Sequence, residues 1–391
     1  MNPLKTIFVF AYYSYKDPVF QSAVLPYLLK ESDNYNFILL TWEQKEWEIK
    51  NNEKIEIEKF LSQNNITWKA KAWHSGRFKL FKKIYDFTIG LLYSLYLIYK
   101  YNCSIVYSEG FPGCIVGHYI SKLSFTKHVI HTFEPHADYM LDAGVWSKKS
   151  WEYKLNKRME KVVGKGADKL ITGTENYKEI LRHYIKTPIQ VIPSCIDTDF
   201  YNFNSKAREI IREKLGIVEN DIVIVYLGKL GGMYMKEEIF KFFSRCLLMD
   251  ENFYLLLMTN ESESSINNLR NEFRIPDNRM HTGFVKKDNV PDYLSASDIA
   301  FCGIRPIPSR RYSSPIKTGE YLSCGLPVII PEGISDDSLV IEENDLGIVF
   351  QDLEKVDIKK VIELKKLDRS MIRAKGINYR SLKNAPSLFE I

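Results

Sequence analysis

Short apolar runs alternate with helical patterns over nearly the whole chain. In the first half, the runs that predict strands are residues 7–10, 37–41, 104–107, 129–131, 169–172 and 190–192. In the second half they are residues 222–227, 253–258, 280–283, 299–301, 328–330 and 347–349. Strands that alternate with helices pair in parallel and are covered by helices on both faces. The sequence therefore predicts an α/β protein with doubly wound parallel sheets.

The pattern is interrupted near the middle of the chain. Pro193 and the turn-forming residues 194–199 separate the two sets of predicted strands. A chain of 391 residues is also longer than one core usually accommodates. We expect a first domain over residues 1–193 and a second over 194–372, followed by a helix and tail over 373–391.

Charge and cysteine usage limit the partners and the compartment. Residues 1–190 contain 27 lysines and arginines against 19 aspartates and glutamates, although the net charge of the whole chain is only +5. A basic first half suits a partner with phosphate groups or an anionic membrane surface. The six cysteines form no C-x-x-C pair and are expected to be reduced thiols of a cytoplasmic protein.

One apolar segment has two interpretations. Residues 88–99 are too few to span a bilayer, which takes about twenty residues. They follow residues 77–83, in which basic and aromatic side chains alternate. The segment is either a buried helix of the first domain, as short apolar runs usually are, or an interfacial helix that rests on anionic lipid.

The most informative motif extends from Ser313 to Ile330. A loop leads into a helix that ends at Gly325, and an apolar strand follows, which is the layout of a ligand site at the edge of a doubly wound sheet. Backbone amides at the helix start and the Lys317 ammonium suit a phosphate, whereas Glu320 can accept hydrogen bonds from a sugar diol. The candidate donor-binding residues of this motif are Ser314, Pro315, Ile316, Thr318 and Glu320.

A glycine-rich turn follows the first strand of the second half. Gly228, Gly231 and Gly232 let backbone amides approach an anion, and Lys229 adds a full positive charge. The turn matches neither the G-x-G-x-x-G dinucleotide pattern nor the G-K-[ST] ending of a P-loop. We expect Lys229 and Lys317 to converge on one diphosphate, with Lys236 as an alternative second cation.

Two histidines and two carboxylates follow a strand of the first half. His131, Glu134, His136 and Asp138 fit no standard zinc pattern, and no cysteine accompanies them. A loop at the catalytic face fits these residue types better than a metal site. The alternative for either histidine is a purely structural one, in which it satisfies hydrogen bonds of the loop.

The order of residues from 220 to 350 resembles glycosyltransferase family 4, a large retaining family with the two-domain GT-B fold. The resemblance rests on the Ser313–Ile330 motif, the glycine-rich turn and the segment after Ile192, which is similar to the family's Pro-Asn-Gly-Val-Asp linker. It implies two Rossmann-like domains that face each other across a cleft, with the terminal helix crossing back to the first domain.

The resemblance also implies residue roles. Glu320 would bind the nucleotide ribose, the lysines at 229 and 317 the diphosphate, and His131, with His136 as the alternative, would lie near the donor sugar and the leaving phosphate. The segment Gly283-Phe284-Val285 resembles the loop whose backbone contacts the base. Phe284 would stack on the base there, or else close a small apolar cluster under the loop.

Two departures from the family pattern affect the sugar and the acceptor. The first carboxylate of the Glu-x7-Glu motif is replaced by Tyr312, so the donor sugar must be held differently. The first loop has no glycine, but Asp17, Pro18 and Gln21 look like the Asp-Pro-x-x-Gln segment of some bacterial members. We expect this loop and the histidine loop to contact the acceptor through Tyr15, Asp17, Glu134, His136 and Asp138.

The resemblance implies a retaining glycosyltransferase that moves a hexose-type sugar from a UDP- or GDP-sugar to a hydroxyl of a glycan or lipid-linked acceptor. No metal or other cofactor is required, and no nucleic acid is expected as a partner. Two alternatives remain. One is a non-hydrolysing nucleotide-sugar epimerase, favoured by the histidine and carboxylate cluster. The other is a catalytically silent, nucleotide-binding partner in a polysaccharide assembly complex, favoured by Tyr312.

Overall fold

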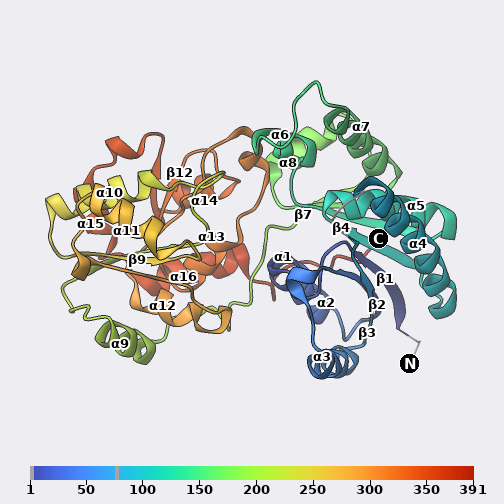
Figure 1. Ribbon diagram of the computed structural model, residues 1–391, viewed down its shortest axis with the longest axis horizontal. Coiled ribbons are helices and arrows are strands. Elements are labelled where there is room, and N and C mark those ends of the chain that lie inside the picture. The colour runs from blue at the N-terminus through green and yellow to red at the C-terminus, as the bar shows by residue number, and fades with distance from the viewer. Residues whose placement is uncertain (1–3, 75–78) are drawn as a thin grey trace. The chain divides into compact units, whose positions relative to one another are not determined.

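The computed structural model describes residues 4–74 and 79–391 (Figure 1). Contacts divide the chain into two compact units, residues 1–193 with 385–391 and residues 194–384. Each unit has its own parallel sheet with helices packed against it, so the predicted pair of Rossmann-like domains is confirmed. The C-terminal end differs from the expected division, because the helix α16 (Arg369–Arg380) belongs to the second unit and only residues 385–391 pack with the first.

The first unit contains a seven-stranded sheet in the order β3-β2-β1-β4-β5-β6-β7. Every pair of neighbouring strands in it is parallel. The central strands are almost fully buried, as expected for a sheet covered on both faces. The strands are β1 (Lys5–Ala11), β2 (Tyr35–Glu43), β3 (Ile66–Ala72), β4 (Ile105–Glu109), β5 (Lys127–Thr132), β6 (Lys169–Thr172) and β7 (Ile189–Val191).

The strand β3 was not predicted from the sequence. It lies at the edge of the sheet and includes Lys69 and Lys71, which interrupt its apolar pattern. Charged side chains are a common feature of edge strands, because they discourage pairing with another chain. The same property hides such a strand from a search for apolar runs.

The helices of the first unit follow the expected alternation, with one split. Residues 18–30 form two short helices and not one, because Pro26 cannot donate a backbone hydrogen bond in the interior of a longer helix. The helices are α1 (Pro18–Ala23), α2 (Leu25–Lys30), α3 (Asn51–Gln63), α4 (Lys79–Tyr101), α5 (Phe111–Ser124), α6 (His136–Asp142), α7 (Trp151–Gly166) and α8 (Glu175–Arg182), with the 3₁₀ turn η1 (Lys45–Trp47).

The C-terminal tail packs into the first unit. The ring of Phe389 is buried, and its centroid lies 5.3–5.4 Å from those of Tyr35, Phe37 and Tyr107. The Lys169 ammonium donates to the backbone carbonyl oxygens of Ser387 and Glu390, at 3.2 and 3.0 Å. The tail therefore contributes an aromatic side chain to the core beneath β1, β2 and β4.

The helix α4 covers the segment for which the sequence allowed two interpretations. Its inner face is buried: a Cβ at Gly90 would lie 2.6 Å from the Trp42 ring, and Leu97 and Ile98 belong to the core. Its outer face exposes large apolar side chains, so the buried-helix interpretation describes only half of α4. Arg77 and Phe78 of the predicted basic segment lie outside the described residues. In the part of the chain that is described, no helix combines the length and apolar character needed to cross a bilayer.

The second unit contains a six-stranded parallel sheet in the order β10-β9-β8-β11-β12-β13. The strands are β8 (Ile222–Leu227), β9 (Phe253–Met258), β10 (Met280–Gly283), β11 (Ile299–Phe301), β12 (Val328–Pro331) and β13 (Gly347–Phe350). The helices before α16 are α9 (Ser205–Lys214), α10 (Glu237–Met249), α11 (Glu263–Glu272), α12 (Val290–Ala296), α13 (Ile316–Ser323), α14 (Asp337–Glu343) and α15 (Ile358–Leu364). The 3₁₀ turns are η2 (Asp277–Arg279), η3 (Lys287–Asn289), η4 (Pro308–Tyr312) and η5 (Leu353–Lys355).

Each sheet has one point where the strand order reverses. In the second unit, β8 and β11 are neighbours, and the chain continues from them toward opposite edges of the sheet. In the first unit, β1 and β4 have the same relationship. Ligands of such sheets bind outside the carboxyl ends of the strands at this point.

A buried ion pair holds the loop before α13 in place. The Arg380 guanidinium is completely buried and donates to Asp337 of α14, to the Ser314 hydroxyl and to the carbonyl oxygen of Ser194. Because an unpaired charge inside a protein is costly, the pair fixes α16, α14 and this loop relative to one another.

Candidate functional site

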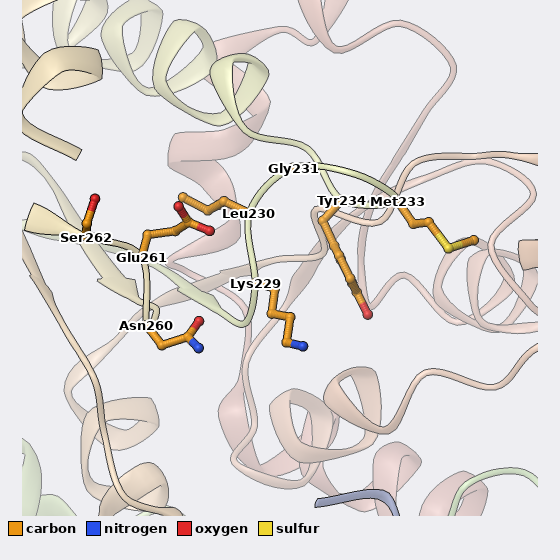
Figure 2. A pocket seen from close by; sticks show the side chains of 8 residues that line it. All are labelled: Lys229, Leu230, Gly231, Met233, Tyr234, Asn260, Glu261 and Ser262. Carbon is orange, nitrogen blue, oxygen red and sulfur yellow. The ribbon is translucent and has the colours of Figure 1, made fainter. Parts of the chain in front are cut away.

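The glycine-rich turn after β8 has the backbone that the sequence suggested. Gly228, Gly231 and Gly232 have φ values of 147°, 78° and 61°, a region that side-chain-bearing residues rarely adopt. The turn borders a pocket of about 530 Å³, into which the Lys229 and Asn260 side chains extend from the ends of β8 and β9 (Figure 2). The pocket is lined by Lys229, Leu230, Gly231, Met233, Tyr234, Asn260, Glu261 and Ser262.

The other predicted cation of this turn has protein partners. Lys236 donates from Nζ to the Ser265 hydroxyl at 3.0 Å, and its Nζ is 4.0 Å from a carboxylate oxygen of Glu261. A cation that the sequence did not indicate lies near the pocket. The Arg310 guanidinium of η4 is 5.5 Å from the ring centroid of Tyr234, and its Nη2 is 3.6 Å from the Met233 sulfur.

The first turn of α13 combines a lysine with a buried carboxylate. Lys317 Nζ lies 2.9 Å from Oε2 of Glu320, and the Tyr201 hydroxyl donates to Oε1 of the same carboxylate at 3.0 Å. Glu320 is only 2% exposed, whereas Lys317 is partly accessible to solvent. Burial, followed by the Glu320 charge, raises the pKa of Tyr201, so its phenol stays protonated as the donor of this bond.

The start of α13 and the turn after β8 lie at the same edge of the sheet. The backbone N–H of Leu227, at the end of β8, donates to the Tyr321 hydroxyl of α13 at 3.1 Å. A third loop joins them, because Glu320 and Lys317 both act electrostatically on Lys287, which follows β10. Burial is the main cause that lowers the Lys287 pKa, although the side chain keeps access to solvent. Three loops of the second unit thus bring positive charge to one edge.

The remaining predicted donor-binding residues have varied surroundings. The Ser314 hydroxyl oxygen accepts hydrogen bonds from the Ser194 N–H, at 3.0 Å, and from the Arg380 guanidinium, so it is engaged within the second unit. Thr318 is fully buried, and Pro315 and Ile316 form the start of α13. Phe284 is 75% exposed and so closes no apolar cluster, whereas Val285 packs against the core.

The predicted convergence of Lys229 and Lys317 stays a prediction. Lys317 is not among the described residues that line the pocket beside Lys229. The two elements that carry these lysines are in contact, because the Leu227 N–H at the end of β8 donates to the Tyr321 hydroxyl of α13.

In the first unit, His131 is the residue before the last of β5 and lies inside a group of aromatic rings. It is 3% exposed, and its Nδ1 lies 2.9 Å from the Tyr107 hydroxyl. Its ring centroid is 4.8 Å from that of Phe133 and 6.3 Å from that of Tyr27. Burial lowers the pKa of His131 to about 4, so the imidazole is neutral at physiological pH.

A buried carboxyl group lies beside this histidine. Glu109, at the end of β4, is paired in register with His131 of β5. Both of its side-chain oxygens are buried, and the Tyr107 hydroxyl, which also contacts His131, acts on the carboxyl group. Burial raises the pKa of Glu109 well above the usual value and so favours the protonated, neutral form of the carboxyl group. The residue that follows, Gly110, has φ of 63°, and a Cβ there would lie 2.5 Å from the Tyr13 hydroxyl.

The other members of the histidine loop do not all contact one another. His136 begins α6, with its ring 5.8 Å from Phe111 and 5.6 Å from Trp146 between centroids, and burial lowers its pKa to about 4. The Asp138 carboxylate accepts from the Tyr153 hydroxyl at 2.9 Å and from Lys157 at 2.6 Å, so α7 holds it. The carbonyl oxygen of Glu134 accepts from the Thr132 hydroxyl at 3.2 Å.

The residues of the first loop that were expected to contact the acceptor have partners within the first unit. Tyr15 packs its ring against Phe20 and Trp68, and its backbone N–H donates to Glu43. Asp17 caps α1 by accepting from the Val19 N–H at 2.8 Å. Both residues thus have clear structural roles.

Some residues of the site could not be found by a motif. Tyr201 is 119 residues from Glu320, and no local pattern links them. Glu109 had a usable signal, because a carboxylate directly after a buried strand lies at the ligand-binding edge of a parallel sheet. Within residues 4–74 and 79–391, no group of histidine, cysteine, aspartate and glutamate has the arrangement of a metal site.

Comparisons with known proteins agree with this architecture. Residues 307–375 match the sequence model of the glucosyltransferase 3-like C-terminal domain, a segment that includes η4, α13 and most of α16. No protein among those with curated descriptions matches the chain significantly.

Solved structures resemble the chain over nearly its full length. HepE of Anabaena, in a complex with UDP-glucose, has a TM-score of 0.71 at 13% identity, with 97% of this chain and 96% of that chain covered. Sucrose-phosphate synthase of Thermosynechococcus elongatus has a TM-score of 0.65 at 13% identity, with 97% and 93% covered. A putative UDP-N-acetylglucosamine 2-epimerase of Listeria monocytogenes has a TM-score of 0.61 at 13% identity, with 97% and 93% covered. The chain therefore has the GT-B fold of glycosyltransferases, and residues 307–375 are similar to the C-terminal domain of glucosyltransferase 3-like proteins.

Proposed function

We propose that the protein is a glycosyltransferase that moves a sugar from a nucleoside diphosphate to a hydroxyl group of a glycan or lipid-linked acceptor. The observation that carries the proposal is the Lys317–Glu320 pair at the start of α13, inside the segment that matches the glucosyltransferase 3-like domain. It lies beside the end of β8, where the glycine-rich turn and Lys229 begin. The fold likeness to HepE, solved with UDP-glucose, supports a nucleotide sugar as donor.

Glu320 and Lys317 are arranged to exchange partners when a nucleotide binds. Lys317 Nζ lies 2.9 Å from Oε2 and 3.3 Å from Oε1 of Glu320, and Oε1 also accepts from the Tyr201 hydroxyl. If Lys317 turns toward a phosphate, Oε2 becomes free to accept a ribose hydroxyl while Oε1 keeps its bond to Tyr201. The buried carboxylate is then never left without a partner, which keeps the cost of the exchange small.

The proposed reaction needs no covalent bond to the protein. The bond between the sugar C1 and the phosphate oxygen breaks, the acceptor oxygen bonds to C1, and the acceptor proton passes to the departing phosphate. Positive charge from Lys229, Lys317 and the amides at the start of α13 would stabilise the diphosphate as it gains charge. If the acceptor attacks the face that the phosphate leaves, the configuration at C1 is retained, as the resemblance to family 4 implies.

His131 is the proposed contact to the transferred sugar. Because it is neutral, it can donate or accept one hydrogen bond without adding charge. Its Nδ1 is engaged with Tyr107, which leaves Nε2 as the atom for a sugar hydroxyl. The donor is proposed to be a UDP- or GDP-sugar, and the acceptor to be part of a surface polysaccharide or glycoconjugate.

The proposal is tested by incubating the purified protein with UDP- and GDP-sugars and a lipid-linked oligosaccharide mixture. Release of nucleoside diphosphate that depends on acceptor, with a product of unchanged anomeric configuration by NMR, is the expected result. Nucleotide binding without turnover for every donor would instead favour the silent partner.

A second candidate function is favoured by one specific observation. Glu109, whose pKa is raised by burial, and the neutral His131 are paired in register on neighbouring strands, and such a pair suits proton transfer at a sugar. The fold is also shared with the putative epimerase of Listeria monocytogenes. Isomerisation of a nucleotide sugar in the absence of any acceptor would support epimerase activity and contradict the transferase.

A further inference from the structure

Three helices form one outer layer of the first unit. α4, α5 and α7 connect β3 to β4, β4 to β5 and β5 to β6, and all three connections proceed in the same direction across the sheet. Right-handed crossovers therefore place the three helices on the same face. α5 contacts both α4 and α7, and α4 and α5 lie side by side in Figure 1. The side of this layer that points away from the sheet is called the outer helical face.

The outer helical face is unusually apolar. On α4, exposed side chains recur every three or four residues, so they form one stripe along the helix. A surface helix normally presents polar residues on that side, because only its inner face needs burial. The exposed large apolar residues of the layer are Phe81, Ile84, Tyr85, Leu92, Tyr96 and Tyr99 of α4, Tyr119, Leu123 and Phe125 at α5, and Trp151, Leu155 and Val162 of α7.

Phe125 is an exposed aromatic residue whose side chain does not stabilise the fold of the first unit. Its side chain is 93% exposed, and its backbone φ of 56° lies in the left-handed region at the end of α5. Glycine or asparagine is usual at such a position, since other side chains cost about 1 kcal/mol or more there. The ring gains no burial that would offset this cost within the first unit.

The exposed charges of the outer helical face are nearly all positive, with Glu152 as the partly exposed carboxylate. The carboxylates in the three helices are Asp86, Glu152 and Glu160, of which Asp86 and Glu160 are buried. Asp86 is bonded to His74, and Glu160 to Lys157 and the Ala137 N–H. The cations around the apolar residues are Lys82, Lys83, Lys100, Lys122, Lys154, Arg158, Lys161 and Lys165. The surplus of positive charge in the first half of the chain is therefore concentrated on the same face as the apolar residues.

This combination selects one kind of partner. Tyrosine, tryptophan and lysine around exposed aliphatic side chains are typical of proteins that lie in the headgroup region of a bilayer. A nucleic acid would use the cations and aromatic rings, but it offers nothing to Ile84, Leu92 or Leu123. We propose that the outer helical face docks the first unit on an anionic lipid bilayer, with Phe125 and the α4 stripe inserted among the headgroups and the lysines against lipid phosphates.

The docking does not depend on the transfer reaction, but it deepens the proposed function by naming the surface that would keep the protein beside a lipid-linked acceptor. It is tested by sedimentation of the full-length protein with vesicles of phosphatidylcholine, with and without phosphatidylglycerol. We expect binding to the anionic vesicles only, decreasing as salt is added. Equal binding to both kinds of vesicle, or none to either, would overturn the proposal.

Two pairs of substitutions locate the surface. Leu92→Gln with Phe125→Asn should weaken vesicle binding roughly tenfold or more, because two apolar side chains lose their burial in the bilayer. Asparagine tolerates a left-handed backbone, so the Tm of the Phe125→Asn single variant should not fall. Lys154→Gln with Arg158→Gln should weaken binding about fivefold for each cation removed.

Matched controls come from the second unit. Leu248, which is 87% exposed, and Met249 end α10, and the exposed Lys355 and Lys359 lie before and in α15. Replacing each pair with glutamine should leave vesicle binding unchanged. If these controls lose as much binding as the variants of the outer helical face, or if single-stranded or duplex DNA displaces the vesicles, the assignment is wrong. Turnover of a water-soluble acceptor should be the same in all these variants, so a failure of docking is distinguishable from a failure of the proposed reaction.

Discussion

Lys317 Nζ lies 2.9 Å from Oε2 of Glu320, one turn further along α13, and thereby gives a buried carboxylate one of its two side-chain partners. The pair has a structural role in the free protein and a proposed chemical role with substrate. These two roles predict different results for substitutions, because a cation that only balances Glu320 becomes dispensable once Glu320 is neutral.

Lys317→Ala should lower kcat/KM for sugar transfer by about 10²–10³, the usual loss when one group that stabilises a developing negative charge is removed. It should also lower the free energy of unfolding by about 1–2 kcal/mol, since Lys317 is partly exposed and water screens the pair. Lys317→Ala with Glu320→Gln should recover stability but not activity, as measured by urea unfolding and initial rates. Recovery of activity in the double variant would mean that Lys317 only balances Glu320.

Tyr201→Phe should lower the free energy of unfolding by about 1.5–3 kcal/mol, because a hydrogen bond to a buried carboxylate is lost while the ring remains. Tyr254→Phe is the matched control, because the Tyr254 hydroxyl donates to a neutral group, the carbonyl oxygen of Leu215, at 3.4 Å. In urea unfolding, Tyr254→Phe should lower the free energy of unfolding by less than Tyr201→Phe does. Equal losses for the two variants would show that the Tyr201–Glu320 bond contributes nothing beyond a neutral one.

His131 should make stability depend on pH in the acid range. Burial lowers its pKa from 6.5 to about 4, so between these values the unfolded chain binds a proton that the folded protein does not. Its contribution to stability is complete above pH 6.5 and is lost as the pH falls toward 4, by up to about 1.4 kcal/mol per pH unit. The difference in free energy of unfolding between the wild type and His131→Gln should therefore shrink on acidification. A constant difference would show that His131 titrates normally.

Glu109 should have the opposite dependence. Its pKa is raised well above 4.5, so above that pH the folded protein holds a proton that the unfolded chain has released. The wild type therefore loses stability as the pH rises toward the folded-state pKa, whereas Glu109→Gln, neutral at every pH, does not. Urea unfolding at a series of pH values should show that the free energy of unfolding of Glu109→Gln increases relative to that of the wild type as the pH rises. Parallel curves for the two proteins would mean that Glu109 is ionised in the fold.

The sequence was most informative where structure is local. β8, β9, β10 and β11 have the predicted bounds, because each is a short apolar run between turn residues. The Lys317–Glu320 pair was also predictable in outline, since residues three apart on a helix are neighbours. The edge strand β3 and the short helices α6, α9 and α14 were missed, because their stability comes from packing rather than from a strong pattern of their own.

The partners of the site residues could not be predicted in the same way. Ser314 looked like a donor-binding residue, but its hydroxyl is bonded to Arg380, 66 residues further along the chain. Asp138 was expected to contact the acceptor, and its carboxylate is bonded to Lys157 and Tyr153 of α7. Such contacts depend on how distant elements pack, which residue types and spacings along the chain do not reveal.

Calorimetric titration with UDP and uridine, and with GDP and guanosine, measures whether Lys229 and Lys317 bind one diphosphate. The wild type should bind one nucleoside diphosphate far more tightly than its nucleoside. Lys229→Ala and Lys317→Ala should each reduce that preference by about tenfold or more, with unchanged nucleoside affinity, and their effects should not add. A diphosphate preference that survives intact in either variant would contradict the account.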